Sequence, residues 1–161
     1  MKGNAAVIAD LETAINLELT LSLQYLLDSR NLKRYGLKKP AAGFATLAGQ
    51  SHDFATKMAS RVLFLDGAPS FEPEAAETHD AVPAIITDAI AAEEAIVKSY
   101  AEFTRRAFEQ GDMAVFHLFQ HLSKWHTSGG NGNTGHLEWL EKQSWQLEEF
   151  GETDYEEVKA D

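Results

Sequence analysis

The sequence predicts an all-α protein, a bundle of four long helices in which one long crossover joins the second helix to the third. Helix-breaking residues are few and clustered, and the long stretches between them carry apolar side chains at helical spacing. The segment 67–81 contains two prolines and has no helical period. No stretch alternates apolar and polar residues as a strand would.

The first two helices are defined by the residues at their ends. Apolar residues recur at helical spacing over about 5–35, and Gly36 ends this pattern. Pro40 suits the start of a second helix, which runs over about 41–66 to an aspartate–glycine pair. Both segments are long enough to span a bundle.

Two further helices and one interruption follow the crossover. The third helix is expected over about 82–109 and the fourth over 112–127. The glycine-rich segment 128–135 interrupts the fourth helix, which resumes over 136–150. Two helical hairpins joined by one long crossover are typical of the ferritin-like four-helix bundle. We expect residues 1–161 to form one such domain, ending in a short C-terminal segment.

The composition excludes several classes of function. The chain has 25 acidic and 14 basic side chains, and its net charge of −11 argues against binding to nucleic acid or to anionic lipid. It has no cysteine, which excludes disulfides, thiolate metal sites and thiol nucleophiles. No apolar run is long enough for a membrane span, and Asp10 interrupts any secretory signal. The sequence therefore predicts a soluble, cytoplasmic protein that uses carboxylates and histidines.

Four ionisable residues stand in apolar helical stripes. Glu18 lies in the stripe of the first helix and Glu93 in that of the third, where Glu94 is the less favoured alternative. His126 and His136 follow the stripe of the fourth helix, on either side of its interruption. Two inward-facing carboxylates require a cation or protons, because an unpaired carboxylate is costly in a core. With two neutral imidazoles, they form a ligand set for one divalent iron, manganese or zinc ion.

A structural interpretation of the same residues stays open. A glutamate at the edge of a stripe can extend its head to solvent, and a core histidine is more often hydrogen-bonded than bound to metal. This interpretation is favoured for each residue alone. For Glu18 and Glu93 together, the metal interpretation is equally favoured.

Several short motifs indicate a family. They cover most of the first two helices and the end of the fourth: Met1-Lys2-Gly3, Glu18-Leu19, Gln24-Tyr25, Arg30, Gly36-Leu37-Lys38, Arg61-Val-Leu-Phe-Leu-Asp-Gly67 with Pro69, and Gly135-His136-Leu-Glu-Trp-Leu-Glu141. In these motifs the chain resembles a bacterioferritin. The resemblance implies a ferritin-like fold, a hollow shell of 24 subunits, oxidation of Fe(II) at a di-iron site, storage of ferric mineral, and haem between paired subunits.

The di-iron ligands implied by the resemblance are incomplete. The family pattern has a glutamate on the first and third helices, where Glu18 and Glu93 match. Its Glu-x-x-His motif on the second helix is replaced by Ser51-His52-Asp53-Phe54. The same motif on the fourth helix is replaced by Asn133-Thr134-Gly135-His136, after an insertion.

The insertion leaves two alignments of the fourth helix open. Counted from the helix start, His126 takes the place of the motif glutamate; counted from its end, Asn133 does. In either alignment three of the six ligands remain. We therefore expect at most one metal ion per subunit, iron or another divalent metal, and weak or absent ferroxidase activity.

The resemblance also implies a haem site. The family's haem ligand is a methionine on the second helix, and His52 occupies that position here. Histidine commonly ligates haem iron, so the replacement preserves this ability. Small residues that would leave room for a ring stand near it: Ala45, Ala48, Gly49, Ala55 and Ala59. The alternative is that these residues only allow close helix packing, with His52 hydrogen-bonded or exposed.

Three hypotheses of function follow. The first is a bacterioferritin-like iron-homeostasis protein, a storage or haem-binding subunit with a degenerate ferroxidase centre. The second is an enzyme with a single metal at Glu18, Glu93, His126 and His136, and the third is a purely structural shell subunit. Leu19, Leu23 and Leu26 form a second apolar face on the first helix, which predicts a homo-oligomer, from a dimer to the full shell. Co-assembly with a ferroxidase-competent subunit is a further expectation.

Overall fold

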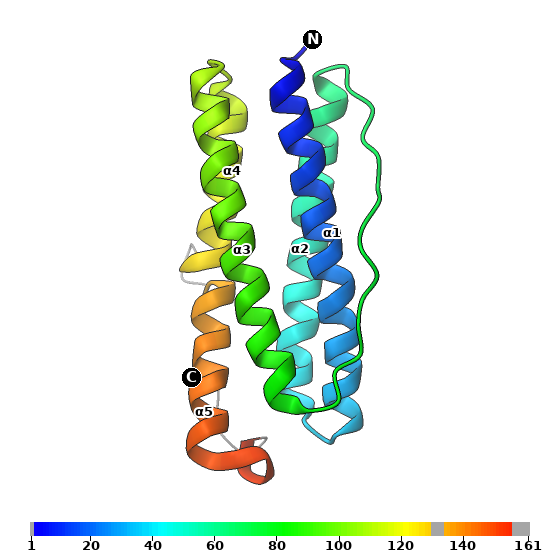
Figure 1. Cartoon of the computed structure of the whole chain (residues 1–161), viewed down its shortest axis with the longest axis vertical. Helices are drawn as coiled ribbons and strands as arrows, with labels where there is room; N and C mark the ends of the chain where they lie inside the picture. Colours follow the sequence, from blue (N-terminus) through cyan, green and yellow to red (C-terminus); the bar gives the residue numbers. More distant parts are fainter. Residues whose placement is uncertain (1, 130–133, 156–161) are drawn as a thin grey trace.

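The computed structural model describes residues 2–129 and 134–155, with side chains described to residue 152. Within these residues the chain forms five α-helices: α1 (Ala5–Arg34), α2 (Lys38–Phe64), α3 (Val82–Glu109), α4 (Met113–Thr127) and α5 (His136–Tyr155). Helix α5 continues the line of α4, so the two together form the fourth rod of a bundle (Figure 1). The all-α ferritin-like fold class is confirmed. The end of the C-terminal segment, 156–161, lies outside the described residues.

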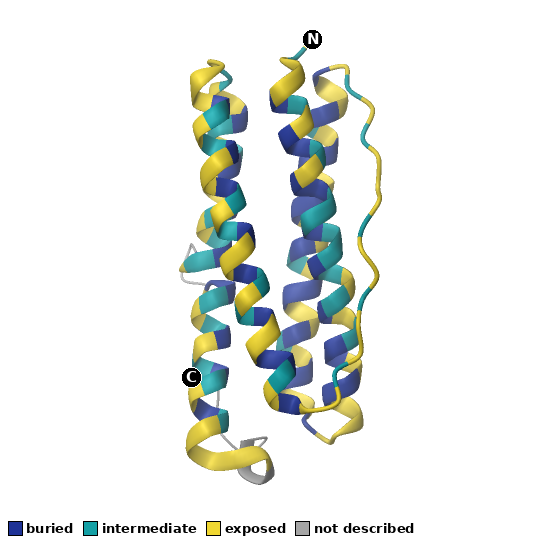
Figure 2. Cartoon of the chain, in the orientation of Figure 1, coloured by how far each residue is buried: buried dark blue, intermediate teal, exposed yellow. Residues whose placement is uncertain are grey.

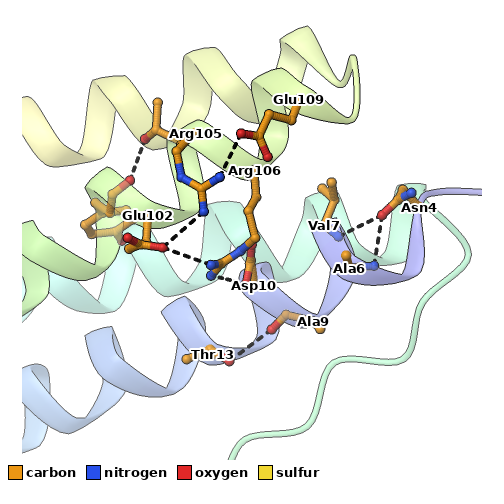
Figure 3. Close-up of polar contacts among 12 residues, drawn as sticks. Asn4, Ala6, Val7, Ala9, Asp10, Thr13, Glu102, Arg105, Arg106 and Glu109 are labelled. Atoms are coloured by element: carbon orange, nitrogen blue, oxygen red, sulfur yellow. Dashed lines mark hydrogen bonds and ion pairs between the residues drawn. The ribbon is translucent and has the colours of Figure 1, made fainter.

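The helix ends follow from local chemistry. The Asn4 side chain caps α1 by accepting hydrogen bonds from the backbone N–H groups of Ala6 and Val7 (Figure 3). Gly36, with φ of +84°, provides the left-handed turn after α1. Helix α2 begins at Lys38, three residues before the predicted start at 41. Pro40 is tolerated there because backbone N–H groups in the first turn have no partner within the helix.

The crossover runs as an extended strap along the bundle, from the end of α2 to the start of α3 (Figure 1). Three polar residues of α1 spaced four apart, Asn16, Thr20 and Gln24, hold the strap. Their side chains bond backbone groups of residues 70–77 at 2.6 to 3.0 Å. This polar ladder satisfies backbone groups that a segment without regular structure would otherwise leave to solvent.

A histidine clasp closes the far end of the strap. Asp28 of α1 and Asp88 of α3 lie 3.2 Å and 2.7 Å from the two ring nitrogens of His79. Burial raises the pKa of Asp28 to about 6, although hydrogen bonds from Gln24 and His79 oppose the rise. The clasp links α1, the strap and α3.

Buried apolar side chains fill the space between the helices, and the exposed residues lie on their outer faces (Figure 2). At one end of the bundle, Arg106 of α3 donates two hydrogen bonds to the carboxylate of Asp10 in α1, at 2.7 and 2.9 Å (Figure 3). Such a two-point contact fixes the relative position of two helices. No helix of the described residues is long and apolar enough to cross a membrane.

Helix α5 approaches α2 closely at a glycine. A Cβ atom built on Gly43 would lie 2.1 Å from Cζ2 of Trp139, whereas one built on Gly49 would meet nothing within 4 Å. The Trp139 ring also packs edge-on against Phe44, with 5.4 Å between ring centroids. Gly43 therefore determines how closely α5 can pack.

We predict opposite effects for two glycine-to-alanine substitutions in α2. Gly43→Ala should lower the free energy of unfolding by about 1–3 kcal/mol, because the new methyl group overlaps Trp139. Gly49→Ala should raise it by about 0.5–1 kcal/mol, because alanine is the better helix former and the space is open. Urea denaturation followed by circular dichroism measures both. Equal midpoints for the two variants would contradict this account.

Candidate metal centre

Four acidic and histidine side chains meet in the middle of the bundle, each from a different helix. They are Glu18 of α1, Glu93 of α3, His126 of α4 and His136 of α5, and all four are 0% exposed. The next residue, Glu94, is exposed, so α3 turns Glu93 inward. The structure thus gathers the four residues that the apolar stripes select.

The His126 ring lies between the two carboxylates. Its Nδ1 atom is 2.5 Å from Oε2 of Glu93, and its Nε2 atom contacts Oε1 of Glu18. The His136 ring lies beside Glu93 as well, with Nδ1 2.9 Å from Oε1 of Glu93. On its other side, Nε2 of His136 is 2.8 Å from Oε1 of Gln50 in α2.

Two tyrosines complete the hydrogen bonding of the carboxylates. Tyr25 of α1 donates to Oε1 of Glu93 at 2.6 Å, and Tyr100 of α3 donates to Oε1 of Glu18 at 2.9 Å. Each tyrosine follows a glutamate by seven residues on its own helix and bonds the glutamate of the other helix. Sequence reasoning missed this contact, although the repeated Glu-x6-Tyr spacing is a visible signal.

The charges of neighbouring side chains set the pKa values of His126 and Glu93 in this centre. Burial alone would lower the pKa of His126, but the two carboxylates raise it to about 10. Burial alone would raise the pKa of Glu93, but His126 and His136 hold it at about 2. Burial, followed by the nearby carboxylates, raises the pKa of Tyr25 and Tyr100 well above the usual value, so both phenols stay neutral donors.

Comparison with known proteins gives the chain its family. The family model of the ferritin-like domain matches residues 8–150. Bacterioferritin of Rhodobacter capsulatus is 28% identical over 144 residues, which cover 89% of this chain and 85% of the relative. Bacterioferritin of Desulfovibrio desulfuricans is 27% identical over 159 residues, which cover 95% of this chain and 85% of that relative.

A solved structure is similar over the whole length. The crystal structure of Rhodobacter capsulatus bacterioferritin superposes with a TM-score of 0.89 at 26% sequence identity, covering 100% of this chain and 99% of that one. The chain is a divergent member of the bacterioferritin family. The Rhodobacter capsulatus structure is described as having a metal-free dinuclear site and a haem iron in a crystallographic special position.

Helix α2 turns Ser51 and Phe54 towards the centre, at the positions where the family pattern has glutamate and histidine. Both are buried. The Phe54 ring packs on both imidazoles, with centroids 5.6 Å from His126 and 6.0 Å from His136. Among the described residues, Oγ of Ser51 and Oε2 of Glu18 are buried without a hydrogen-bond partner. At these two positions α2 therefore contributes a hydroxyl group and a phenyl ring in place of a carboxylate and an imidazole.

After the interruption, α5 begins close to the end of α4 and continues the fourth rod of the bundle. A Cβ atom on Gly135 would lie 2.2 Å from the carbonyl oxygen of Thr127, so the chain passes very close to the point where α4 ends. This close return places the His126 and His136 rings 4.8 Å apart, although ten positions separate them in the sequence. His126 accordingly lies in the centre, where the alignment from the helix start puts the motif glutamate. The alternative position, Asn133, lies outside the described residues.

His52, the residue predicted to bind haem, lies away from the centre. Its side chain is 67% exposed, and its nearest ionic neighbour is Asp53, at 3.9 Å. Of the small residues near it, only Ala45 and Gly49 are exposed; Ala48, Ala55 and Ala59 face the core. The exposed small-residue face is therefore narrower than the sequence analysis predicts, because three of these five residues pack against the core.

We predict that the charges of the metal-free centre stabilise the fold most between about pH 4.5 and 6.5. The raised pKa of His126 contributes stability that is complete below 6.5 and lost as pH rises towards 10. The lowered pKa of Glu93 contributes stability that is complete above 4.5 and lost as pH falls towards 2. Urea denaturation at a series of pH values measures the profile. His126→Gln should flatten its alkaline side, while His121→Gln, at an exposed position of α4, should leave it unchanged.

Proposed function

We propose that this chain is an iron-storage subunit of bacterioferritin type whose own centre does not carry out the coupled oxidation of two Fe(II) ions. Membership of the bacterioferritin family supports the storage role. One observation carries the second half of the proposal: Ser51 and Phe54 take the places of a carboxylate and an imidazole on the α2 side of the centre.

The residues present do not fit a dinuclear iron site. Two metal ions held about 3.5–4 Å apart need anionic bridging groups that neutralise their charge. At the two bridging positions of the family pattern this chain has a neutral hydroxyl group, Ser51, and an imidazole, His126. The imidazole already spans Glu18 and Glu93, and Phe54 packs against it in a T-shaped contact. A second ion would therefore have no anionic bridging group.

Oligomerisation follows from the same proposal. Leu23 and Leu26 on α1 are 42% and 49% exposed, and two large apolar side chains on one face of a helix favour a contact with another subunit. We propose a homo-oligomer in the cytoplasm, at least a dimer and in its full form a shell of 24 subunits. Iron oxidised by a ferroxidase-competent partner subunit in the same shell would supply the mineral.

We predict that this protein oxidises Fe(II) without the rapid first phase of a di-iron centre. Anaerobic protein loaded with Fe(II) and mixed with oxygen in a stopped-flow absorbance experiment should show only slow oxidation. The triple variant Ser51→Glu, Phe54→His, His126→Glu restores the six ligands of the family pattern and should oxidise Fe(II) about tenfold faster or more.

Two results complete this test. The control variant Ser51→Ala, Phe54→Leu changes the same α2 positions without adding ligands and should behave like the unmodified protein. A rapid phase that saturates at two irons per chain in the unmodified protein would contradict the proposal.

We also propose that haem binds at a subunit interface through His52. The imidazole is exposed and flanked by Ala45 and Gly49, which leave space beside it. The exposed leucines of α1 supply apolar surface of the kind that a porphyrin ring would cover.

We predict a Soret absorption band after haem is added to the purified protein. His52→Ala should abolish the band, because it removes the iron ligand. His121→Ala removes another exposed histidine and should preserve it. Absence of the band in the unmodified protein, or its persistence in His52→Ala, would contradict haem ligation by His52.

A further inference from the structure

The strap is attached to α1 in two chemically different ways along its length (Figure 1). Near its start, the backbone N–H of Glu72 donates to the side-chain oxygen of Asn16 at 2.6 Å. Near its end, the backbone N–H of Glu77 donates to the side-chain oxygen of Gln24 at 2.9 Å, and the clasp of His79 follows two residues later. The end of the strap is therefore held by ionisable side chains as well as by amides.

The end of the strap forms one wall of a cavity of about 300 Å³ between α1 and α3. Four carboxylates line this cavity: Asp28 of α1, Asp88 of α3, and Glu74 and Glu77 of the strap. Among the described residues that line it, His79 alone can carry a positive charge. The ring of Tyr25, whose hydroxyl group donates to Glu93, lines the same cavity, which therefore adjoins the metal centre.

The geometry of the clasp suits a charged imidazole. Nδ1 of His79 lies 3.2 Å from Oδ1 of the buried Asp28, and Nε2 lies 2.7 Å from Oδ2 of Asp88. A neutral ring has one N–H group and can donate to one of these carboxylates, whereas the charged ring donates to both and offsets their charge. Loss of that proton leaves the carboxylates of the cavity around a neutral ring, and their mutual repulsion then acts to move the strap away from α1.

Both buried partners of the clasp bind protons more tightly when it is closed. Burial alone would lower the pKa of His79, but its contacts with Asp88 and Asp28 raise it above the usual value. Burial, opposed by hydrogen bonds from Gln24 and His79, raises the pKa of Asp28 from 3.8 to about 6. A group whose pKa rises on closing stabilises the closed form at low pH, and this contribution is lost as pH increases through the raised pKa. Closing therefore takes up protons, and increasing pH favours opening.

We propose that the clasp of Asp28, His79 and Asp88 is a proton-operated latch, which holds the end of the strap against α1 and α3 when protons are bound and releases it as pH increases. The inference goes beyond iron storage and stands without it, because the residues of the clasp are separate from those of the metal centre. The movement is local. Opening widens the cavity beside Tyr25, while the start of the strap stays bonded to Asn16.

Hydrogen exchange at single backbone amides of the unmodified protein tests the latch. The amides are resolved by mass spectrometry with electron-transfer fragmentation, and the rates are corrected for the intrinsic pH dependence of exchange. The protection of the Glu77 amide should fall about tenfold or more from pH 5 to pH 8, because a pKa of Asp28 near 6 in the closed form and 3.8 in the open form alone accounts for about tenfold. The protection of the Glu72 amide, bonded to Asn16, should stay constant.

Substitutions in the clasp separate its two titrating groups. Asp28→Asn imitates the protonated carboxyl group and should keep more of the Glu77 protection at pH 8 than the unmodified protein does. The double variant Asp28→Asn, His79→Gln has neither titrating group and should protect the Glu77 amide equally at pH 5 and pH 8. His117→Gln removes an exposed histidine of α4 and is the control, which should show the profile of the unmodified protein.

Three results would overturn the inference. They are a Glu77 protection that stays constant or rises from pH 5 to pH 8, an equal fall at the Glu72 and Glu77 amides, or a fall in the double variant as large as in the unmodified protein. The first two are measured without any substitution, so they stand even where a variant fails to fold. The iron-storage proposal is judged separately, by the rate of Fe(II) oxidation.

Discussion

The contact of the His126 ring with the carboxylates of Glu18 and Glu93 is the interaction on which the centre of this bundle depends. Two fully buried carboxylates would repel each other and lose their hydration, at a cost of several kcal/mol per ion. The imidazole between them is protonated at both ring nitrogens and positively charged at neutral pH, because both carboxylates raise its pKa to about 10. In the metal-free protein a side chain thus supplies part of the positive charge that metal ions supply in a dinuclear site.

The surrounding helices hold this contact in place from several directions. The crossed hydrogen bonds of Tyr25 to Glu93 and of Tyr100 to Glu18 fix the register of α1 against α3. Farther along the same pair, the salt bridge between Asp10 and Arg106 and the clasp of His79 fix the two ends. Contacts at three levels of the bundle therefore fix the position of α1 relative to α3. The position of the interrupted fourth rod, α4 and α5, does not depend on these contacts.

Apolar periodicity was sufficient to predict the fold class and to distinguish Glu93 from Glu94, because burial follows directly from the position of a residue in a stripe. The sequence analysis predicts the start of α2 three residues late, because Pro40 indicates a boundary although it fits inside a first turn. The place of His126 could not be fixed because it depends on how the chain returns after an insertion. The strap contacts of Asn16, Thr20 and Gln24 depend on tertiary geometry, which sequence spacing alone does not contain.

Stability alone does not account for the polar centre. A buried ionic cluster is often no more stabilising than apolar side chains of the same volume, and removing one partner from it is strongly destabilising. The neighbouring positions Ser51 and Phe54 show that uncharged side chains can be accommodated at the same level of the bundle. The chain nevertheless combines two carboxylates, two imidazoles and two phenols there, and leaves Oε2 of Glu18 without a partner among the described residues. That donor set has the composition of a cation site.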